Sequence, residues 1–261
     1  MKRYTILVVV LLMSAATLLA GCDQQPATAE KRELLIYCGV TMMQPMEEIA
    51  TIIEKEENCT ITIKAGGSGN LLETIQTDRV GDLYLPGDDS YIVTCLAQDL
   101  VIETVLVGYN KAAMIVAEGN PLGITADSTS FTNEDYVLFL ADPDTASVGR
   151  ETQKILANMG ILDQAMGNVQ SLAANATELT DALKNGEADL IVNWYATSTW
   201  PENAPYVDAL PISAEYAVKK KLVLGLLSTS ESPELARKFM AYVASDAGQR
   251  LFNKYGLSDV E

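Results

Sequence analysis

The stretch CTITIKAGGSGNLLETI, residues 59–75, contains the change of pattern that decides the fold. It begins as an alternating, β-branched segment that ends near Lys64 and predicts a strand. Glycines then surround Ser68, and from about Asn70 leucine and isoleucine recur at helical spacing. The stretch therefore predicts a strand, a tight turn and a helix, which is one unit of a parallel α/β sheet.

The same order of elements recurs on both sides of this stretch. Before it, the apolar run 34–38 predicts a buried strand, and Thr41 follows just ahead of a helix with Pro45 in its first turn. After it, residues 82–85 predict a third strand. Further strands are predicted at 105–116 with a break at 108–110, at 136–141, at 190–194 and at 222–227, and further helices near 149–159, 176–185, 233–244 and 247–254. The alternation predicts the α/β class.

The N-terminus has the order of regions that is typical of an export signal. Lys2 and Arg3 are followed by an apolar segment at 6–19, and the small residues Ala20 and Gly21 then precede Cys22. Such an apolar core is short for a membrane span, so we expect a signal peptide.

Residues 18–22, LLAGC, resemble the lipobox of bacterial lipoproteins. The resemblance implies a signal peptide at 1–21, diacylglycerol on the thiol of Cys22, and a lipid anchor and linker at 22–32. It also implies retention at the inner membrane, because Asp23 follows the cysteine. The alternative is an ordinary signal peptide with a chance cysteine.

Charge and composition exclude several functional classes. The formal net charge of −17 argues against nucleic acid, which requires a basic surface to displace counterions. The chain contains no histidine, which removes the commonest general base and metal ligand. The segment GGSGN at 66–70 falls short of a nucleophile elbow and has no histidine to activate its serine. We therefore expect no enzyme activity, no cofactor and no resident metal.

Three cysteines remain beyond Cys22. Cys38 lies late in one predicted strand and Cys59 begins the next, so parallel pairing would hold their thiols too far apart to bond. With Cys95 these cysteines number three, and an odd number cannot all pair within one chain. We expect buried thiols rather than disulfides.

Thr41 and Ser68 each follow a predicted strand and precede a predicted helix. In an open parallel sheet such positions meet at the crevice outside the strand ends. Helix starts there offer unpaired N–H groups, and glycines allow close approach of a ligand to the backbone. The pattern predicts an anion site without formal positive charge. The alternative is that both residues are only helix caps.

From Leu34 to Leu257 the chain resembles the periplasmic molybdate-binding family of ABC transporter substrate-binding proteins. The resemblance rests on the order and spacing of several segments: Val40-Thr41 with 45–50, Gly66-Gly67-Ser68-Gly69, 81–85, Asp142-Pro143 through Val148-Gly149-Arg150, 185–189, 233–249 and Lys254-Tyr255-Gly256. It implies the type II periplasmic binding fold, with two lobes that are each a mostly parallel sheet flanked by helices and with the ligand in the cleft.

The strand segments near 105–116 and 216–227 must carry the chain out of the first lobe and back. We expect lobe 1 at 33–107 plus 218–261 and lobe 2 at 108–217, joined by a hinge that closes on the ligand. The protein is expected to be a monomer.

The resemblance also implies a set of ligand-binding residues. Thr41 and Ser68 match the hydroxyl positions of the first lobe. Backbone N–H groups near Val148 and Ala176 match those of the second lobe.

A tyrosine hydroxyl from a strand end completes the family's site, and Tyr195 is the candidate here. The matching stretch is one residue longer than expected, so Asn193 and Trp194 are alternatives. Arg150 begins a predicted helix and is a possible contact. The acidic turn around Asp88 is interpreted as a solvated turn rather than as part of the site.

The resemblance therefore implies a lipid-anchored solute-binding protein on the periplasmic side of the bacterial cytoplasmic membrane. Its partners are a small tetrahedral oxyanion, molybdate or tungstate first, and the permease of an ABC transporter. One alternative is the same fold binding sulfate or another small anion. An alternative of a different class is a surface lipoprotein that binds a protein partner.

Overall fold

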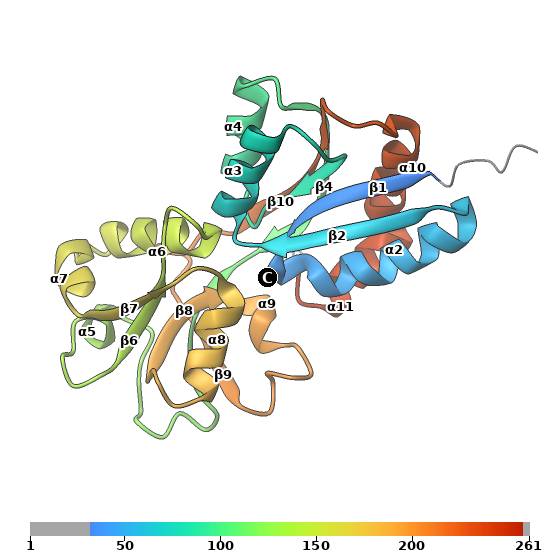
Figure 1. Cartoon of the computed structure of the whole chain (residues 1–261). Helices are drawn as coiled ribbons and strands as arrows, with labels where there is room; N and C mark the ends of the chain where they lie inside the picture. The colour runs from blue at the N-terminus through green and yellow to red at the C-terminus, as the bar shows by residue number, and fades with distance from the viewer. Residues whose placement is uncertain (1–31, 258–261) are drawn as a thin grey trace, which may run out of the picture. The chain divides into compact units, whose positions relative to one another are not determined.

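The computed structural model describes residues 32–257, which belong to one compact unit and contain two five-stranded sheets (Figure 1). The first sheet has the order β2-β1-β3-β10-β4, with β1 (Glu33–Gly39), β2 (Thr60–Gly66), β3 (Leu83–Leu85), β4 (Val101–Asn110) and β10 (Lys220–Leu227). The second has the order β7-β6-β8-β5-β9, with β5 (Ala112–Ala117), β6 (Leu138–Ala141), β7 (Val169–Ala173), β8 (Leu190–Trp194) and β9 (Val207–Pro211). Cys22 and the predicted signal peptide lie outside the described residues.

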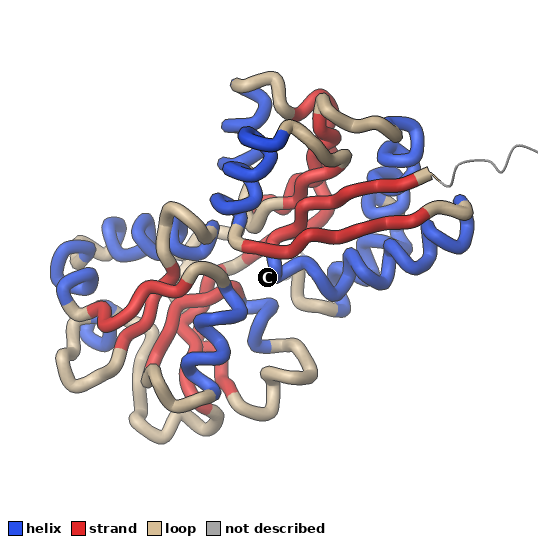
Figure 2. Tube along the Cα trace, viewed as in Figure 1, coloured by secondary structure: helices blue, strands red, loops and turns tan. Residues whose placement is uncertain are grey.

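Helices flank both sheets (Figure 2). Those associated with the first sheet are η1 (Val40–Met42), α2 (Met43–Glu57), α3 (Ser68–Asp78), α4 (Ser90–Ala97), α10 (Pro233–Ala244) and α11 (Asp246–Lys254). Those of the second are α5 (Ser128–Phe131), α6 (Ser147–Asn158), α7 (Leu162–Gly167), α8 (Ala176–Lys184) and α9 (Tyr195–Ser198).

The alternation of side chains along β1 explains why helices cover both faces of the first sheet. Ile36 and Cys38 point into one core with α2, α10 and α11, whereas Tyr37 points into another with α3 and α4. Burial on both faces makes β1 a continuous apolar run, as is typical of a parallel sheet. The second sheet has its own core, which includes Ile191 and Val192 of β8.

Each sheet has four strands in one direction and one reversed strand, which is β10 in the first sheet and β5 in the second. Chain crossing explains the reversal. Strand β4 ends at Asn110 and β5 begins at Ala112, so the chain enters the second sheet from the edge at which β6 and β8 end. The same argument applies to β10, which re-enters the first sheet after β9. The predicted α/β, two-lobed architecture with mostly parallel strands is confirmed.

The crossings lie between Asn110 and Ala112 and between Pro211 and Lys220. Residues 108–110 pair with β10 in the first sheet, although we assigned them to lobe 2 from the sequence. Cys38, Cys59 and Cys95 are buried and form no disulfide among the described residues, as expected.

Candidate functional site

Loops after three neighbouring strands meet at one edge of the first sheet. Gly39 pairs with Gly66, so Thr41 and Ser68 follow their strands at the same level. Leu85 pairs with Cys38, which brings Gly87 to this edge as well. These loops and the starts of α6 and α8 enclose a cavity of about 10 Å³, lined by Gly39, Val40, Thr41, Gly66, Gly67, Ser68, Gly87, Ala146, Ser147, Val148, Asn175 and Ala176. Four of the predicted ligand-binding residues, Thr41, Ser68, Val148 and Ala176, therefore lie together between the two lobes.

Ser68 is the first residue of α3 and is only 3% exposed. The helix cap is Gly67, and no side chain makes a cap hydrogen bond, so Ser68 is not the cap. Its Oγ accepts a hydrogen bond from Gly87 N at 3.0 Å, which leaves the hydroxyl proton for another acceptor. Tyr84 holds the adjacent backbone by donating to Ser68 O at 2.7 Å. Burial raises the pKa of Tyr84 well above its ordinary value, so this donor keeps its proton.

Thr41 lies in η1 and is 3% exposed. Its hydroxyl does not cap η1, whose cap residue Gly39 makes no side-chain hydrogen bond. Within residues 32–257 the side chain of Thr41 makes no hydrogen bond. The interpretation of Thr41 and Ser68 as simple helix caps does not match this geometry.

The second lobe contributes two helix starts. Val148 lies in the first turn of α6 and Ala176 is the first residue of α8, where N–H groups have no intrahelical partner. The side chain of Asn175 caps α8 by accepting from Thr177 N and Glu178 N at 2.9 and 3.1 Å, which leaves the amide of Ala176 uncapped. Partial positive charge at both helix starts favours an anion in this cavity.

No charged side chain is among the described residues that line the cavity. Asp88 is buried beside it, but its Oδ1 accepts from Ser90 N at 2.8 Å at the start of α4. The turn is therefore not solvated at Asp88 as we expected, because this residue is buried. Asp88 does not line the cavity, although Gly87 of the same turn does.

The structure places Tyr195 outside the small cavity, although the resemblance implies that its hydroxyl completes the site. Strand β8 ends at Trp194 and the chain turns into α9 at Tyr195, so these two side chains point in different directions. Tyr195 is 45% exposed and does not line the small cavity. Trp194 is 1% exposed, and its Nε1 donates to Ser147 Oγ at 3.3 Å.

Asn193 is also turned away from the cavity, because its hydrogen bonds hold the start of α8. Its Nδ2 donates to Ala176 O at 2.7 Å and to Thr180 Oγ1 at 3.0 Å. Its Oδ1 accepts from Trp194 N at 2.8 Å. Asn193 therefore supports the position of the Ala176 amide.

Arg150 does not line the cavity either. Its Nε donates to Pro143 O at 3.1 Å, and its guanidinium lies over the ring of Tyr91, 4.1 Å from the centroid. Tyr91 belongs to α4 and Arg150 to α6, so this stacking joins the two lobes. Burial raises the pKa of Tyr91, although the positive charge of Arg150 acts in the opposite direction.

Ser147 and Gly87 are among the cavity residues that were not predicted from the sequence. We placed the helix start near Gly149, two residues late, which left Ser147 in a loop. A better estimate of that start would have brought Ser147 into the same strand–serine–helix pattern as Ser68. The need for glycine at position 87 is visible only in the tertiary structure, because a Cβ atom there would lie 2.2 Å from Ser147 Oγ of the other lobe.

The two lobes touch directly beside the cavity. Gly69 N donates to Thr145 O at 2.8 Å. A Cβ atom on Gly69 would lie 1.9 Å from Asp144 O, and one on Gly67 would lie 2.4 Å from Thr145 O. Only glycine allows these approaches, so the described structure has its lobes closed.

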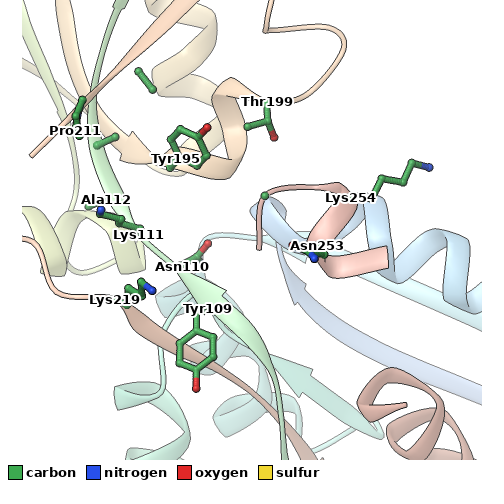
Figure 3. A pocket seen from close by; sticks show the side chains of 13 residues that line it. Tyr109, Asn110, Lys111, Ala112, Tyr195, Thr199, Pro211, Lys219, Asn253 and Lys254 are labelled. Carbon is green, nitrogen blue, oxygen red and sulfur yellow. The ribbon is translucent and has the colours of Figure 1, made fainter. Parts of the chain in front are cut away.

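A second, larger cavity of about 450 Å³ lies near the chain crossing (Figure 3). Tyr195 lines it together with Lys111, Lys219 and Asn253. Asn110 also lines it, and its Nδ2 donates to Gly87 O at 2.9 Å. The starts of α6 and α8 do not line this cavity, which has instead the start of the short helix α9 and the side chains of three lysines, Lys111, Lys219 and Lys254.

Residues 32–257 contain no group of three or more potential ligands, among histidine, cysteine and acidic side chains, that could hold a metal ion. None of the helices in this part of the chain is both long and apolar enough to cross a membrane.

A two-lobed fold with loops and helix starts around an interlobe cavity defines a binding protein of the type II periplasmic class. Residues 34–258 match the model of the bacterial extracellular solute-binding protein family, and the chain belongs to this family.

Curated relatives cover most of the chain. A Haemophilus influenzae protein named only as a binding protein is 25% identical over 88% of this chain and 92% of its own length. A Bacillus subtilis protein assigned as an ABC transporter substrate-binding lipoprotein is 23% identical over 98% of each chain. The molybdate-binding protein of Escherichia coli is 20% identical over 89% of this chain and 91% of its own.

Solved structures share the fold. The periplasmic molybdate-binding protein of Azotobacter vinelandii has a TM-score of 0.73 at 15% identity, over 87% of this chain and all of that chain. The sulfate-binding protein of Mycobacterium tuberculosis has a TM-score of 0.75 at 13% identity, over 86% of each chain. A periplasmic thiamin-binding protein has a TM-score of 0.75 at 17% identity, over 90% of this chain and 86% of its own. The fold thus serves several ligands.

Proposed function

We propose that this solute-binding protein captures a small tetrahedral oxyanion, molybdate or tungstate first, and delivers it to the permease of an ABC transporter. The observation that carries the proposal is the small cavity between the lobes, where hydroxyls of Thr41 and Ser68 meet the helix starts at Val148 and Ala176. Helix N-termini bind anions without formal charge. Relatives that are named for molybdate and for ABC transport support the choice of ligand and partner.

The donor set favours anions that carry no proton at neutral pH. Hydrogen bonds to a charged ligand each contribute about 1.5–3 kcal/mol, and molybdate, tungstate and sulfate only accept them. Hydrogen phosphate also has a proton to donate, and no carboxylate lines the cavity to receive it. Phosphate should therefore bind more weakly than the fully ionised anions.

The closed lobes leave room for about one water molecule, so a four-oxygen anion requires them to move apart. We propose that the lobes, at 33–107 plus 218–261 and at 108–217, rotate about the two chain crossings. The protein would act as a monomer tethered to the periplasmic side of the membrane through lipid on Cys22 and the linker 22–32.

Calorimetric titration of the mature protein tests the ligand. Molybdate, tungstate, sulfate, phosphate, thiamin and ferric citrate should be compared at one ionic strength. We expect one or more fully ionised oxyanions to bind at micromolar concentration or below, and phosphate to bind much more weakly. Preference for thiamin or iron, or no binding of any oxyanion, would refute the proposal.

Membrane fractionation tests the anchor. Replacement Cys22→Ser should prevent lipidation, so the variant should leave the membrane fraction or stay unprocessed. A variant that remains lipid-modified like the wild type would exclude Cys22 as the attachment site.

A further inference from the structure

We propose that Ser147 is a direct ligand of the bound anion and that Trp194 is its positioning residue. This inference rests on the proposed function and extends it, because it adds a side-chain hydroxyl from the second lobe to a site otherwise built there from amides. Ser147 lines the small cavity together with Thr41 and Ser68.

The hydroxyl of Ser147 is not used for the local needs of its helix. Ser147 is the first residue of α6 and is 5% exposed. The helix cap is Ala146, and no side chain makes a cap hydrogen bond at this helix start. A buried hydroxyl without a local structural role at a helix start is available to a ligand in the cavity.

The hydrogen bond from Trp194 determines that the Ser147 hydroxyl can donate to a ligand. An indole N–H is a donor only, so Ser147 Oγ accepts from Trp194 Nε1 at 3.3 Å and keeps its own proton for another acceptor. This distance is long for such a bond, and a small movement of α6 on binding could shorten it. The side chain of Trp194 is held by the core of the second lobe.

Ser68 has the same arrangement in the first lobe. Ser68 Oγ accepts from Gly87 N at 3.0 Å, and Ser147 Oγ lies 2.2 Å from the position that a Cβ on Gly87 would occupy. Each serine therefore receives one hydrogen bond from the protein and keeps its own proton for an acceptor in the cavity that both serines and Gly87 line. A tetrahedral anion with four acceptor oxygens fits such a set of converging donors.

The experiment measures the affinity of Ser147→Ala, Trp194→Phe and their double mutant for molybdate, tungstate and sulfate. The Ser147→Ala variant should bind the anion about 10- to 100-fold more weakly, because it loses one charge-assisted hydrogen bond. Trp194→Phe should weaken it less, roughly threefold to tenfold, because the hydroxyl remains but is no longer oriented. The double mutant should bind like Ser147→Ala alone, since Trp194 acts through that hydroxyl.

Ser130→Ala is the matched control. Ser130 is a buried serine of the same lobe that lies outside the cavity and contacts Thr125. The Ser130→Ala substitution should lower the melting temperature of the protein without changing its affinity for the anion. Circular dichroism would confirm that each variant is folded before titration.

Different failures have different meanings. If the wild type binds an oxyanion and Ser147→Ala binds it as tightly as Ser130→Ala does, the inference is wrong and the proposed function stands. If the effects of Ser147→Ala and Trp194→Phe add fully, Trp194 does not act through Ser147. If the wild type binds none of the three anions, the proposed function and this inference fall together.

Discussion

The two halves of the candidate site are built differently. The first lobe supplies hydroxyls from residues directly after neighbouring strands, Thr41 and Ser68. The second lobe supplies mainly helix starts, at Val148 and Ala176. A hydroxyl can be removed by one substitution, whereas an amide cannot. Single substitutions should therefore change anion affinity more readily in the first half. The contribution of the second half is better tested by substitutions that disturb the contacts between the lobes and so prevent closure.

The largest effect should come from the first half. Double replacement Thr41→Ala with Ser68→Ala removes two hydrogen bonds to a charged ligand, so binding should weaken by roughly 2–5 kcal/mol. Calorimetry should be paired with thermal unfolding of the same protein. Unchanged affinity with a lowered melting temperature would mean that both hydroxyls serve only the fold.

The second-largest effect on anion binding should come from a substitution that prevents the two lobes from closing. Replacement Gly69→Ala places a Cβ atom 1.9 Å from Asp144 O, and overpacking of this kind costs about 1–3 kcal/mol. We expect weaker anion binding and X-ray scattering that no longer changes when the anion is added. Gly167→Ala is the control, because nothing lies within 4 Å of its Cβ position. Equal affinities of the two variants would contradict closure at Gly69.

Removing the stacking between lobes should have a smaller effect. Replacement Arg150→Met keeps an apolar stem over Tyr91 but loses the cation–π contact, which contributes about 0.5–1 kcal/mol at partly exposed sites. Tyr91→Leu should weaken anion binding by a similar amount, and the two losses should not add. A loss of 1.5–3 kcal/mol for Arg150→Met alone would instead indicate direct contact with the anion.

The smallest effect is expected for an ion pair away from the cleft, and it should change the stability of the fold rather than anion binding. Glu48 of α2 accepts hydrogen bonds from Lys254 Nζ at 2.6 Å and from the hydroxyl of Tyr255, and these bonds lower the pKa of Glu48. A lowered pKa in the folded state means that the stabilisation is present above about pH 4.3, the ordinary value, and is lost as the pH falls through the folded-state pKa.

Replacement Glu48→Gln should therefore lower the free energy of unfolding at pH 7 by only a few tenths of a kcal/mol, because solvent screens this pair. The difference from wild type should shrink in urea titrations as the pH falls below about 4.3. Affinity for the anion should not change. Glu118→Gln, at an exposed position, provides the comparison. A difference that does not shrink as the pH is lowered would show that the charge of Glu48 is not the cause.

Local sequence was sufficient for the first half of the site. The strand before Ser68 and the helix after it are visible as a change from alternating to helical spacing. Parallel pairing of Gly39 with Gly66 then brings Thr41 beside Ser68. Both inferences need only the pattern of neighbouring residues and the rule that parallel strands end at one edge.

The second half depended on where elements begin and end. A shift of two residues in the predicted start of α6 hid Ser147, and the end of β8 separated Trp194 from Tyr195. Helix and strand ends are set by packing and by hydrogen bonds from distant residues, so sequence patterns place them only to within a few residues.

By itself, the sequence of this protein determined the α/β class. It also predicted the two lobes, the export signal and the first-lobe hydroxyls of Thr41 and Ser68, which line the small cavity. Only the tertiary structure decided that Trp194 meets Ser147, that Arg150 stacks on Tyr91, and that Gly87 lies between the two serines' hydroxyls. The physical reason is that hydrophobic periodicity specifies which face of an element is buried, whereas hydrogen-bond partners between lobes depend on how distant segments pack.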